Sequence, residues 1–172
     1  SSTDNTAALI RDHTRDDSRF SLISAAPLPA GWLGKPWALS QGFSAGAGQV
    51  VITLDADVRL ESQAISSCVK LLEKLNVDFI SPYPRQLAIT FSERLIQPLL
   101  QWSWLSTVPL RIAEKSSRKS LAVANGQFFI ANRNSLEKIS GFDQISHEVL
   151  DDIELARRLI NAGFYGTVVD GS

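Results

Sequence analysis

The stretch Gln49-Val50-Val51-Ile52-Thr53-Leu54-Asp55-Ala56-Asp57 decides the fold of this chain. Residues 50–54 are apolar or β-branched on both alternating faces, which predicts a strand buried on both sides in the middle of a parallel sheet. Asp55 and Asp57 follow directly at its carboxyl end. In open α/β sheets, ligands bind at that edge.

Asp55 and Asp57 stand one residue apart, and two such carboxylates repel each other and lose hydration unless a cation lies between them. The pair therefore predicts a divalent metal that holds a phosphate-bearing substrate. In the alternative interpretation, Asp55 caps a turn and Asp57 faces water.

Size and charge narrow the class of protein. The chain has 172 residues, 44% of them hydrophobic, which is enough for the core of a single domain over residues 1–172. The 17 Lys and Arg and 18 Asp and Glu give a formal net charge of -1, which disfavours a nucleic-acid partner. The single cysteine, Cys68, forms no internal disulfide or multi-cysteine metal site and is interpreted as a small buried residue.

The ends of the chain predict a piece of a larger protein. The chain contains no methionine and opens within a polar stretch, so we expect an excised fragment. We see no charged-then-apolar leader and no run of about 18 apolar residues, which predicts a soluble or peripheral chain.

Helical and extended patterns alternate along the sequence, which favours an α/β fold with parallel pairing. The predicted helices lie within residues 1–17, 36–45, 63–75 and 149–162, and the predicted strands are 20–24, 50–54 and 77–80. A further apolar run covers residues 128–131.

Leu95 to Leu110 is strongly apolar, contains Trp102 and Trp104, and is too short and too interrupted by proline to span a bilayer. Its tryptophans and flanking basic residues suit a segment at a membrane surface or along an apolar acceptor groove. An ordinary helix that closes the core remains the alternative.

Five short motifs follow one another in order. They are Ser2-Thr3-Asp4-Asn5-Thr6, Gly34-Lys35 with Ala38, Asp55-Ala56-Asp57, Asn125-Gly126-Gln127 and Asp151-Asp152-Ile153-Glu154-Leu155-Ala156. Each is weak alone, but the ordered set covers nearly the whole chain and is more specific. In this order the chain resembles the family 2 glycosyltransferases, most closely the branch associated with hopanoid and carotenoid biosynthesis. The resemblance implies a GT-A, Rossmann-like fold, with a mostly parallel sheet flanked by helices and incomplete at the amino end.

The resemblance also implies a donor site. The reaction is transfer of a sugar from a nucleotide-diphosphate donor, a UDP-sugar, to an acceptor hydroxyl. Asp55 and Asp57 match the family's DXD motif, which holds a divalent metal, and Asp57 is the more direct ligand. Mg²⁺ or Mn²⁺ suits these hard oxygen ligands and neutralises the charge on the leaving diphosphate. Lys35 matches a position near the nucleotide or diphosphate.

On the acceptor side, the resemblance implies that Asp152 is the general base. Asp151, Gly126 and Gln127 occupy acceptor-binding positions, although the family has Glu where this chain has Asp151. We expect a lipid-linked acceptor from the apolar segment 95–110, and an inverting reaction on the cytoplasmic side of the membrane in the parent protein.

The chain departs from the family pattern at both ends. The first strand and its acidic pair, which cradle the nucleobase and ribose, and the carboxyl-terminal Gln-x-x-Arg-Trp type of motif are absent. We therefore expect a fragment with weak donor affinity or none, which can be inactive by itself.

Two alternative interpretations assign the chain to other classes of protein. A haloacid-dehalogenase-like, Mg²⁺-dependent phosphohydrolase would use Asp55 as nucleophile and Asp57 as acid, with Asp151 and Asp152 as its metal-binding pair. That interpretation leaves Gly34-Lys35 without a role. A non-catalytic module would instead bind a membrane or a partner through residues 95–110.

Overall fold

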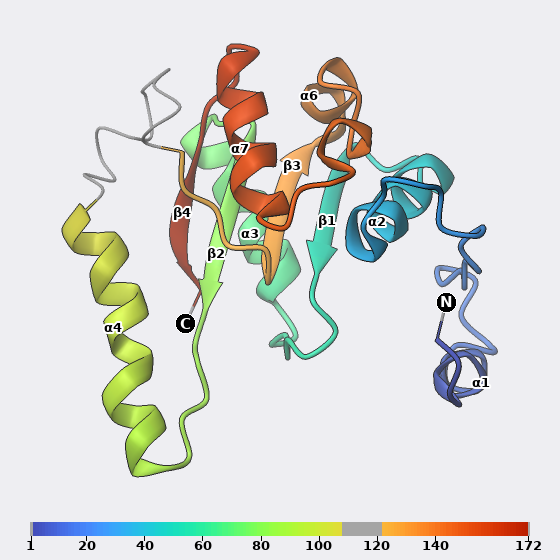
Figure 1. Ribbon diagram of the computed structural model, residues 1–172, viewed down its shortest axis with the longest axis horizontal. Helices are drawn as coiled ribbons and strands as arrows, with labels where there is room; N and C mark the ends of the chain where they lie inside the picture. The colour runs from blue at the N-terminus through green and yellow to red at the C-terminus, as the bar shows by residue number, and fades with distance from the viewer. Residues whose placement is uncertain (1, 108–121, 172) are drawn as a thin grey trace.

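The computed structural model describes residues 2–107 and 122–171, which form an α/β fold around a four-stranded sheet (Figure 1). The helices are α1 (Thr6–His13), α2 (Gly34–Ala45), α3 (Ala64–Leu75), α4 (Phe91–Thr107), α6 (Arg133–Lys138), the 3₁₀ turn η2 (Asp143–Ile145) and α7 (Asp151–Asn161). The strands are β1 (Val50–Leu54), β2 (Phe79–Pro84), β3 (Phe128–Asn132) and β4 (Gly166–Gly171).

The sheet is mixed, with strand order β1-β3-β2-β4. β3 pairs antiparallel with both β1 and β2, while β2 and β4 are parallel. The predicted α/β class is confirmed, but the predictions of a mostly parallel sheet and of a central β1 are wrong for the described strands. β1 lies at an edge and is only half-buried, because β3 returns in the opposite direction between β1 and β2.

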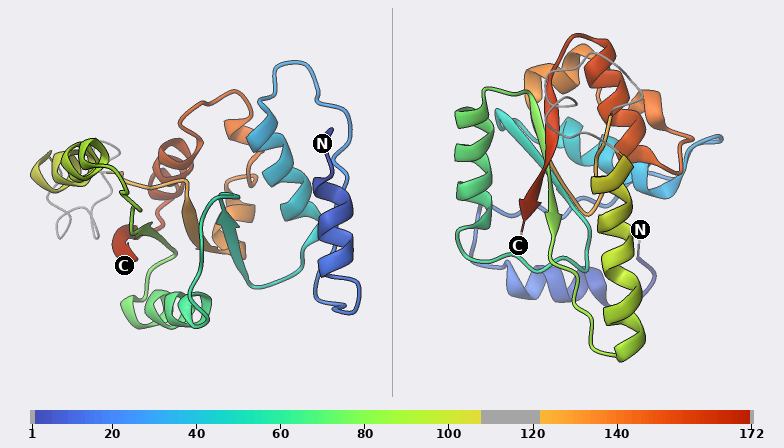
Figure 2. Two further views of the ribbon diagram at one scale, coloured as in Figure 1. Left: turned by 90° about the horizontal axis from the view of Figure 1, so that it is seen from below. Right: turned by 90° about the vertical axis from the view of Figure 1, so that its left-hand side faces the viewer.

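Helices cover both faces of the sheet (Figure 2). On one face, Phe79 and Phe129 pack with Leu155 and Leu159 of α7, and α2 contributes Leu39. On the other face, α3 brings Leu72 against Ile80 and Ile130. Neighbouring residues of β2 and β3 thus enter opposite cores, as the two-residue period of a strand requires.

The predicted helices at 36–45, 63–75 and 149–162 are confirmed as α2, α3 and α7, and the apolar run at 128–131 forms β3. Gly163 follows α7 with φ +89°, a conformation that favours glycine at a helix end. The predicted strand at 20–24 is wrong. Phe20 and Ile23 lie exposed in irregular chain, and no strand of the described sheet pairs with them.

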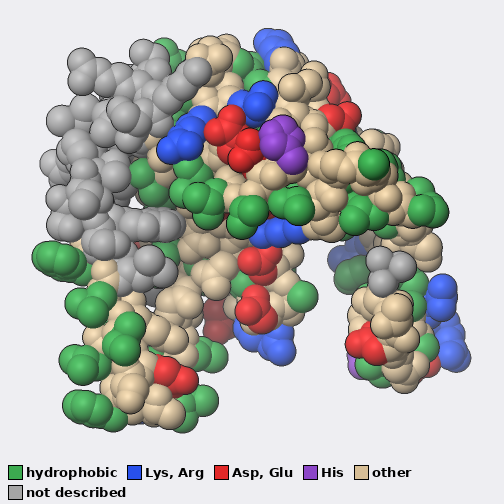
Figure 3. Space-filling model, in the orientation of Figure 1, with side chains coloured by type: hydrophobic (Ala, Val, Ile, Leu, Met, Phe, Trp, Pro, Cys, Tyr) green, Lys and Arg blue, Asp and Glu red, His purple; other side chains and the backbone are tan. Residues whose placement is uncertain are grey.

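Two helices stand away from the sheet, α1 near the amino end and α4 on the opposite side (Figures 1 and 2). α1 has no buried residue. α4 exposes large apolar side chains, including Phe91 at 82% and Trp102 at 66%, and they gather on its projecting surface (Figure 3). The predicted segment Leu95 to Leu110 begins in α4, and its last three residues lie outside the described part. No helix in residues 2–107 and 122–171 is both long and apolar enough to cross a membrane.

Candidate active site

The carboxyl end of β1 supplies the first acidic group of the site. The backbone N–H of Asp55 donates to the carbonyl of Gln127 at 2.9 Å, and the carbonyl of Asp55 accepts from the N–H of Val58 at 3.2 Å. These bonds fix a turn immediately after the strand. Asp57 is exposed on that turn, and its side chain has no ion pair or hydrogen bond with the described residues.

The start of α2 supplies the cation. Lys35 Nζ lies 3.0 Å from Asp55 Oδ1 and 3.7 Å from Asp151 Oδ2. Two bonds hold the amino-terminal half of α2 in place: Leu33 N–H donates to the Ser146 carbonyl at 2.7 Å, and Ser40 Oγ donates to Asp143 Oδ1 at 2.7 Å. The Lys35 ammonium therefore joins the end of β1 to the start of α7.

Burial and neighbouring charges both shift the pKa values of Lys35 and Asp151. Burial disfavours the charged form of Lys35, but its hydrogen bond to Asp55 and the charges of Asp151, Asp55 and Asp152 outweigh that effect and raise its pKa above the ordinary value. Burial raises the pKa of Asp151; the Lys35 charge opposes that rise, and the Asp152 charge adds to it. One cation and three carboxylates thus form a group that we call the Lys35 cluster: Lys35, Asp55, Asp151 and Asp152.

The Asn125-Gly126-Gln127 loop closes against these groups. Ser81 Oγ, buried in β2, accepts from the N–H of Asn125 at 2.7 Å, and it lies 2.9 Å from the Asn125 carbonyl, to which it can donate. Asn125 Oδ1 in turn accepts from the N–H of Gln127 at 2.9 Å. A Cβ at Gly126 would stand 3.1 Å from Lys35 Nζ and 3.4 Å from Asp152 Cγ, so glycine allows the loop to approach both residues.

The structure thus brings together Lys35, Asp55, Asp151, Asp152 and Gly126, from four separate stretches of sequence. The side chain of Gln127 turns elsewhere, toward Gln86. The Ser2 to Thr6 motif leads into α1, with Thr6 as its first residue, and contributes nothing to this cluster.

The carboxylates offer a partial metal site. Among residues 2–107 and 122–171, no group of three or more His, Cys, Asp or Glu side chains is arranged to hold a metal. Asp55 and Asp57 fit a cation that takes one or two protein carboxylates and completes its shell with substrate phosphate and water, as Mg²⁺ does. Asp57 is open to such an ion, while Asp55 already contacts Lys35.

Sequence reasoning missed two polar residues that shape the loop. Ser81 was not singled out, although a serine between Ile80 and Pro82 in a buried strand is a signal for a specific hydrogen bond. Gln86 was also missed; its Nε2 donates to Gln127 Oε1 at 2.9 Å. No local sequence pattern marks Gln86, because its partner lies 41 residues away.

Comparison with known proteins decides the family. The model for glycosyl transferase family 2 matches residues 1–140, most of the chain. The chain belongs to this family. No curated protein matched it.

Three solved structures share the fold of this family 2 chain, each at 20% sequence identity and over 99% of the chain. One is a mannosyltransferase from Pyrobaculum calidifontis in complex with GDP-Man and Mn²⁺, with a TM-score of 0.68. Another is glucosyl-3-phosphoglycerate synthase from Mycobacterium tuberculosis in complex with UDP, with a TM-score of 0.53. The third is mannosyl-3-phosphoglycerate synthase from Rubrobacter xylanophilus, with a TM-score of 0.50.

The likeness confirms the GT-A glycosyltransferase fold and covers 43%, 56% and 52% of those three chains, respectively. The chain therefore spans about half the length of these structures. The comparisons give no support to the phosphohydrolase alternative. The hopanoid and carotenoid branch stays a prediction.

Replacing Lys35 tests the charge cluster. We expect Lys35→Met to raise the pKa of Asp151 further, because the ammonium lowers it while burial and Asp152 raise it. Carbon-13 NMR titration of the side-chain carboxyl measures this pKa.

Because the folded pKa of Asp151 lies above its ordinary 3.8, the contribution of this group to the free energy of unfolding falls as pH rises from that value through the raised pKa. Lys35→Met should widen that pH window.

The matched control for this test is Lys70→Met, which removes an equal charge from the exposed surface of α3, on the other face of the sheet. It should leave the Asp151 titration unchanged. An Asp151 pKa that is the same in the wild type and in Lys35→Met would contradict the assigned geometry.

Proposed function

We propose that this chain is the catalytic part of a glycosyltransferase that moves a sugar from a nucleotide-diphosphate donor to an acceptor hydroxyl. The observation that carries the proposal is the convergence of Asp55, Asp151, Asp152 and Gly126 on Lys35. Family membership supplies the reaction class, and this convergence supplies groups suited to a diphosphate and to a reacting hydroxyl. Single displacement by that hydroxyl would invert the anomeric centre.

The donor side is assigned to Lys35, Asp55 and Asp57. Asp57 and Asp55 would hold Mn²⁺ or Mg²⁺, with Asp57 the more direct ligand because Asp55 already contacts Lys35. The metal would supply positive charge to the leaving diphosphate. The Lys35 ammonium would bind a diphosphate oxygen at the same edge. The solved relatives with GDP-Man and Mn²⁺ and with UDP support a nucleotide-sugar donor, and we propose a UDP-sugar.

The acceptor side is assigned to the start of α7 and the loop before β3. Asp152 would take the proton from the acceptor hydroxyl as its oxygen attacks the sugar carbon and the nucleotide diphosphate departs. Asp151, buried and paired with Lys35, would keep the first turn of α7 in place and contact the acceptor. Gly126 and Gln127 would form the wall of the acceptor site.

The apolar surface of α4 supports a lipid-linked acceptor at a membrane surface. Phe91, Leu95, Leu99 and Trp102 recur at three- and four-residue spacings, so they share one face of the helix, and all are exposed. Such a face suits the boundary between headgroups and acyl chains. We place that contact on the cytoplasmic leaflet, with hopanoid or carotenoid biosynthesis as the proposed setting.

Nucleotide binding tests the donor assignment. We expect UDP to bind the chain weakly in the presence of Mn²⁺, and Asp57→Asn to lower that affinity by at least about tenfold, because a metal ligand is removed. Isothermal titration calorimetry with and without Mn²⁺ measures both quantities. Asp12→Asn, which neutralises an exposed carboxylate on α1, is the control and should bind as the wild type does. Equal, metal-independent binding by wild type and Asp57→Asn would refute the assignment.

Substitution of the proposed base tests the chemistry. In the full-length parent protein, Asp152→Asn should lower the rate of sugar transfer by about 10²- to 10⁴-fold, because the acceptor hydroxyl loses its proton acceptor. The affinity for UDP should stay within about twofold of the wild-type value, since Asp152 is not assigned to the donor site. Glu154→Gln, on the same turn of α7, is the control. Undiminished transfer by Asp152→Asn would exclude it as the base.

A further inference from the structure

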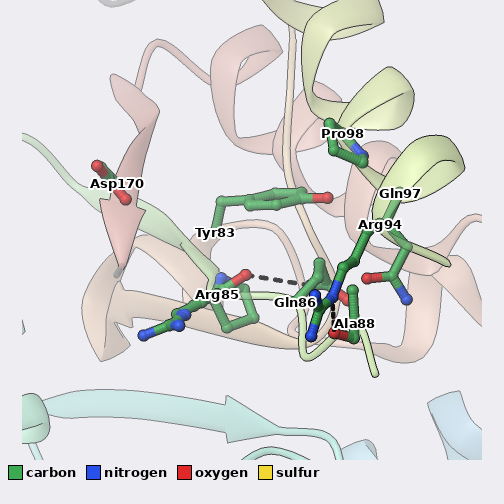
Figure 4. A pocket seen from close by; sticks show the side chains of 9 residues that line it. Tyr83, Arg85, Gln86, Ala88, Arg94, Gln97, Pro98 and Asp170 are labelled. Carbon is green, nitrogen blue, oxygen red and sulfur yellow. Dashed lines mark hydrogen bonds between the residues drawn. The ribbon is translucent and has the colours of Figure 1, made fainter. Parts of the chain in front are cut away.

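A cavity of about 320 Å³ lies between the end of β2 and the inner side of α4 (Figure 4). None of its lining residues belongs to the Lys35 cluster. They are Tyr83, Pro84, Arg85, Gln86, Ala88, Arg94, Gln97, Pro98 and Asp170. This mixture of guanidinium, amide and aromatic groups is suited to a polar ligand.

One hydrogen-bonded pair joins this cavity to the proposed active site. Gln86 Nε2 donates to Gln127 Oε1 at 2.9 Å and to the carbonyl of Pro84 at 3.1 Å. The residue before Gln127 is Gly126, which lies against Lys35 and Asp152. A molecule in the cavity would therefore lie next to the loop that borders the proposed base.

Arg94 is oriented for an anion. Its Nε donates to the carbonyl of Ala88 at 3.2 Å, which holds the side chain across the cavity (Figure 4). Its two terminal nitrogens make no hydrogen bond or ion pair with the described residues. Arg85 points away from Arg94 in Figure 4, so it adds positive charge at the rim without forming a two-arginine clamp.

One buried acceptor in the lining has no donor among the described residues. Gln97 Oε1 is buried and accepts no hydrogen bond from the described residues. A buried acceptor is costly unless a donor reaches it, and a ligand hydroxyl would supply that donor.

α4 is oriented the opposite way from an ordinary surface helix. Its polar side, with Arg94 and Gln97, faces the cavity, whereas Phe91, Leu95 and Trp102 face outward. A helix that packs on a core places its apolar face inward. The outward face therefore fits an apolar phase beside the cavity, which favours a lipid over a soluble ligand.

Asp170 is the one acidic residue among the described residues of the lining. It pairs in register with Tyr83 across β2 and β4, and in Figure 4 it lies by the base of that side chain, away from Arg94 and Gln97. The Arg94 end of the cavity is therefore the end suited to negative charge.

We propose that this cavity binds the phosphate group of the acceptor, with Arg94 holding phosphate oxygens and Gln97 Oε1 accepting a hydrogen bond from a ligand hydroxyl. The apolar chain of the same molecule lies along the outward face of α4. The inference rests on the proposed function, because it takes the ligand of this cavity to be the sugar acceptor. It deepens that function by naming a phosphate-bearing lipid as the substrate class.

Vesicle binding by the 172-residue chain tests the inference without any nucleotide. The probes are phosphatidylcholine vesicles with and without 10 mol% phosphatidic acid, and soluble glycerol 3-phosphate. We expect phosphatidic acid to increase the fraction of chain that sediments with vesicles, and Arg94→Gln to reduce the phosphatidic-acid-dependent partition coefficient by at least about tenfold, because a hydrogen-bonded charge is lost. The control Arg85→Gln removes an equal charge from the rim of the cavity. It should reduce the same partition coefficient by less than about fivefold, which is the effect of a nonspecific surface charge.

Each outcome decides a part of the inference. Equal reductions in Arg94→Gln and Arg85→Gln would overturn the site in favour of nonspecific attraction. Binding of glycerol 3-phosphate that depends on Arg94, without enrichment on vesicles, would support the phosphate site and overturn the lipid source. Binding of neither probe would overturn both. Arg94-dependent vesicle binding, combined with equal and metal-independent UDP binding by the wild type and Asp57→Asn, would refute the donor assignment alone.

Discussion

The ion pairs of Lys35 are the contacts on which the arrangement of this site depends. Asp55, Asp151 and Asp152 come from two elements nearly a hundred residues apart, and their mutual repulsion would favour separation if no cation lay between them. The ammonium reaches Asp55 at 3.0 Å and Asp151 at 3.7 Å. Because Asp151 is also buried, loss of that cation would leave a carboxylate with neither water nor a counter-charge.

The mixed sheet explains how the cluster is assembled. β3 runs antiparallel to β1, so the loop that precedes β3 arrives at the carboxyl end of β1. There the carbonyl of Gln127 accepts the N–H of Asp55, and Gly126 lies against Lys35 and Asp152. A parallel partner would bring the end of another strand to this place, and its loop would leave the edge in a different direction.

Much of this could be predicted from the sequence. The helical spacing of apolar residues predicts both α3 and α7, because a buried apolar stripe is visible within the segment itself. The grouping of Lys35, Asp55, Asp151 and Asp152 could be expected only through the ordered motifs of a known family, since no local rule joins residues so far apart. The roles of those residues, Asp57 included, remain proposals.

Other features could not be predicted, for physical reasons. An apolar strand such as Val50 to Leu54 has the same composition whether its neighbour is parallel or antiparallel, so strand order was not accessible. Phe20 to Ser24 has strand composition, but strand formation needs a partner, and no strand of the described sheet pairs with it. The outward apolar face of α4 depends on which side the helix turns to the cavity, and periodicity alone does not determine that side.

The central claim is that a metal and a nucleotide meet at the Asp55 edge beside Lys35. The most direct test is paramagnetic broadening of amide NMR signals by substoichiometric Mn²⁺ in the presence of UDP. The account predicts that the signals of Asp55, Ala56, Asp57 and Gly126 broaden first, while those of the exposed helix α1 persist. Selective broadening around Asp12 to Asp17, with residues 55–57 unaffected, would contradict it.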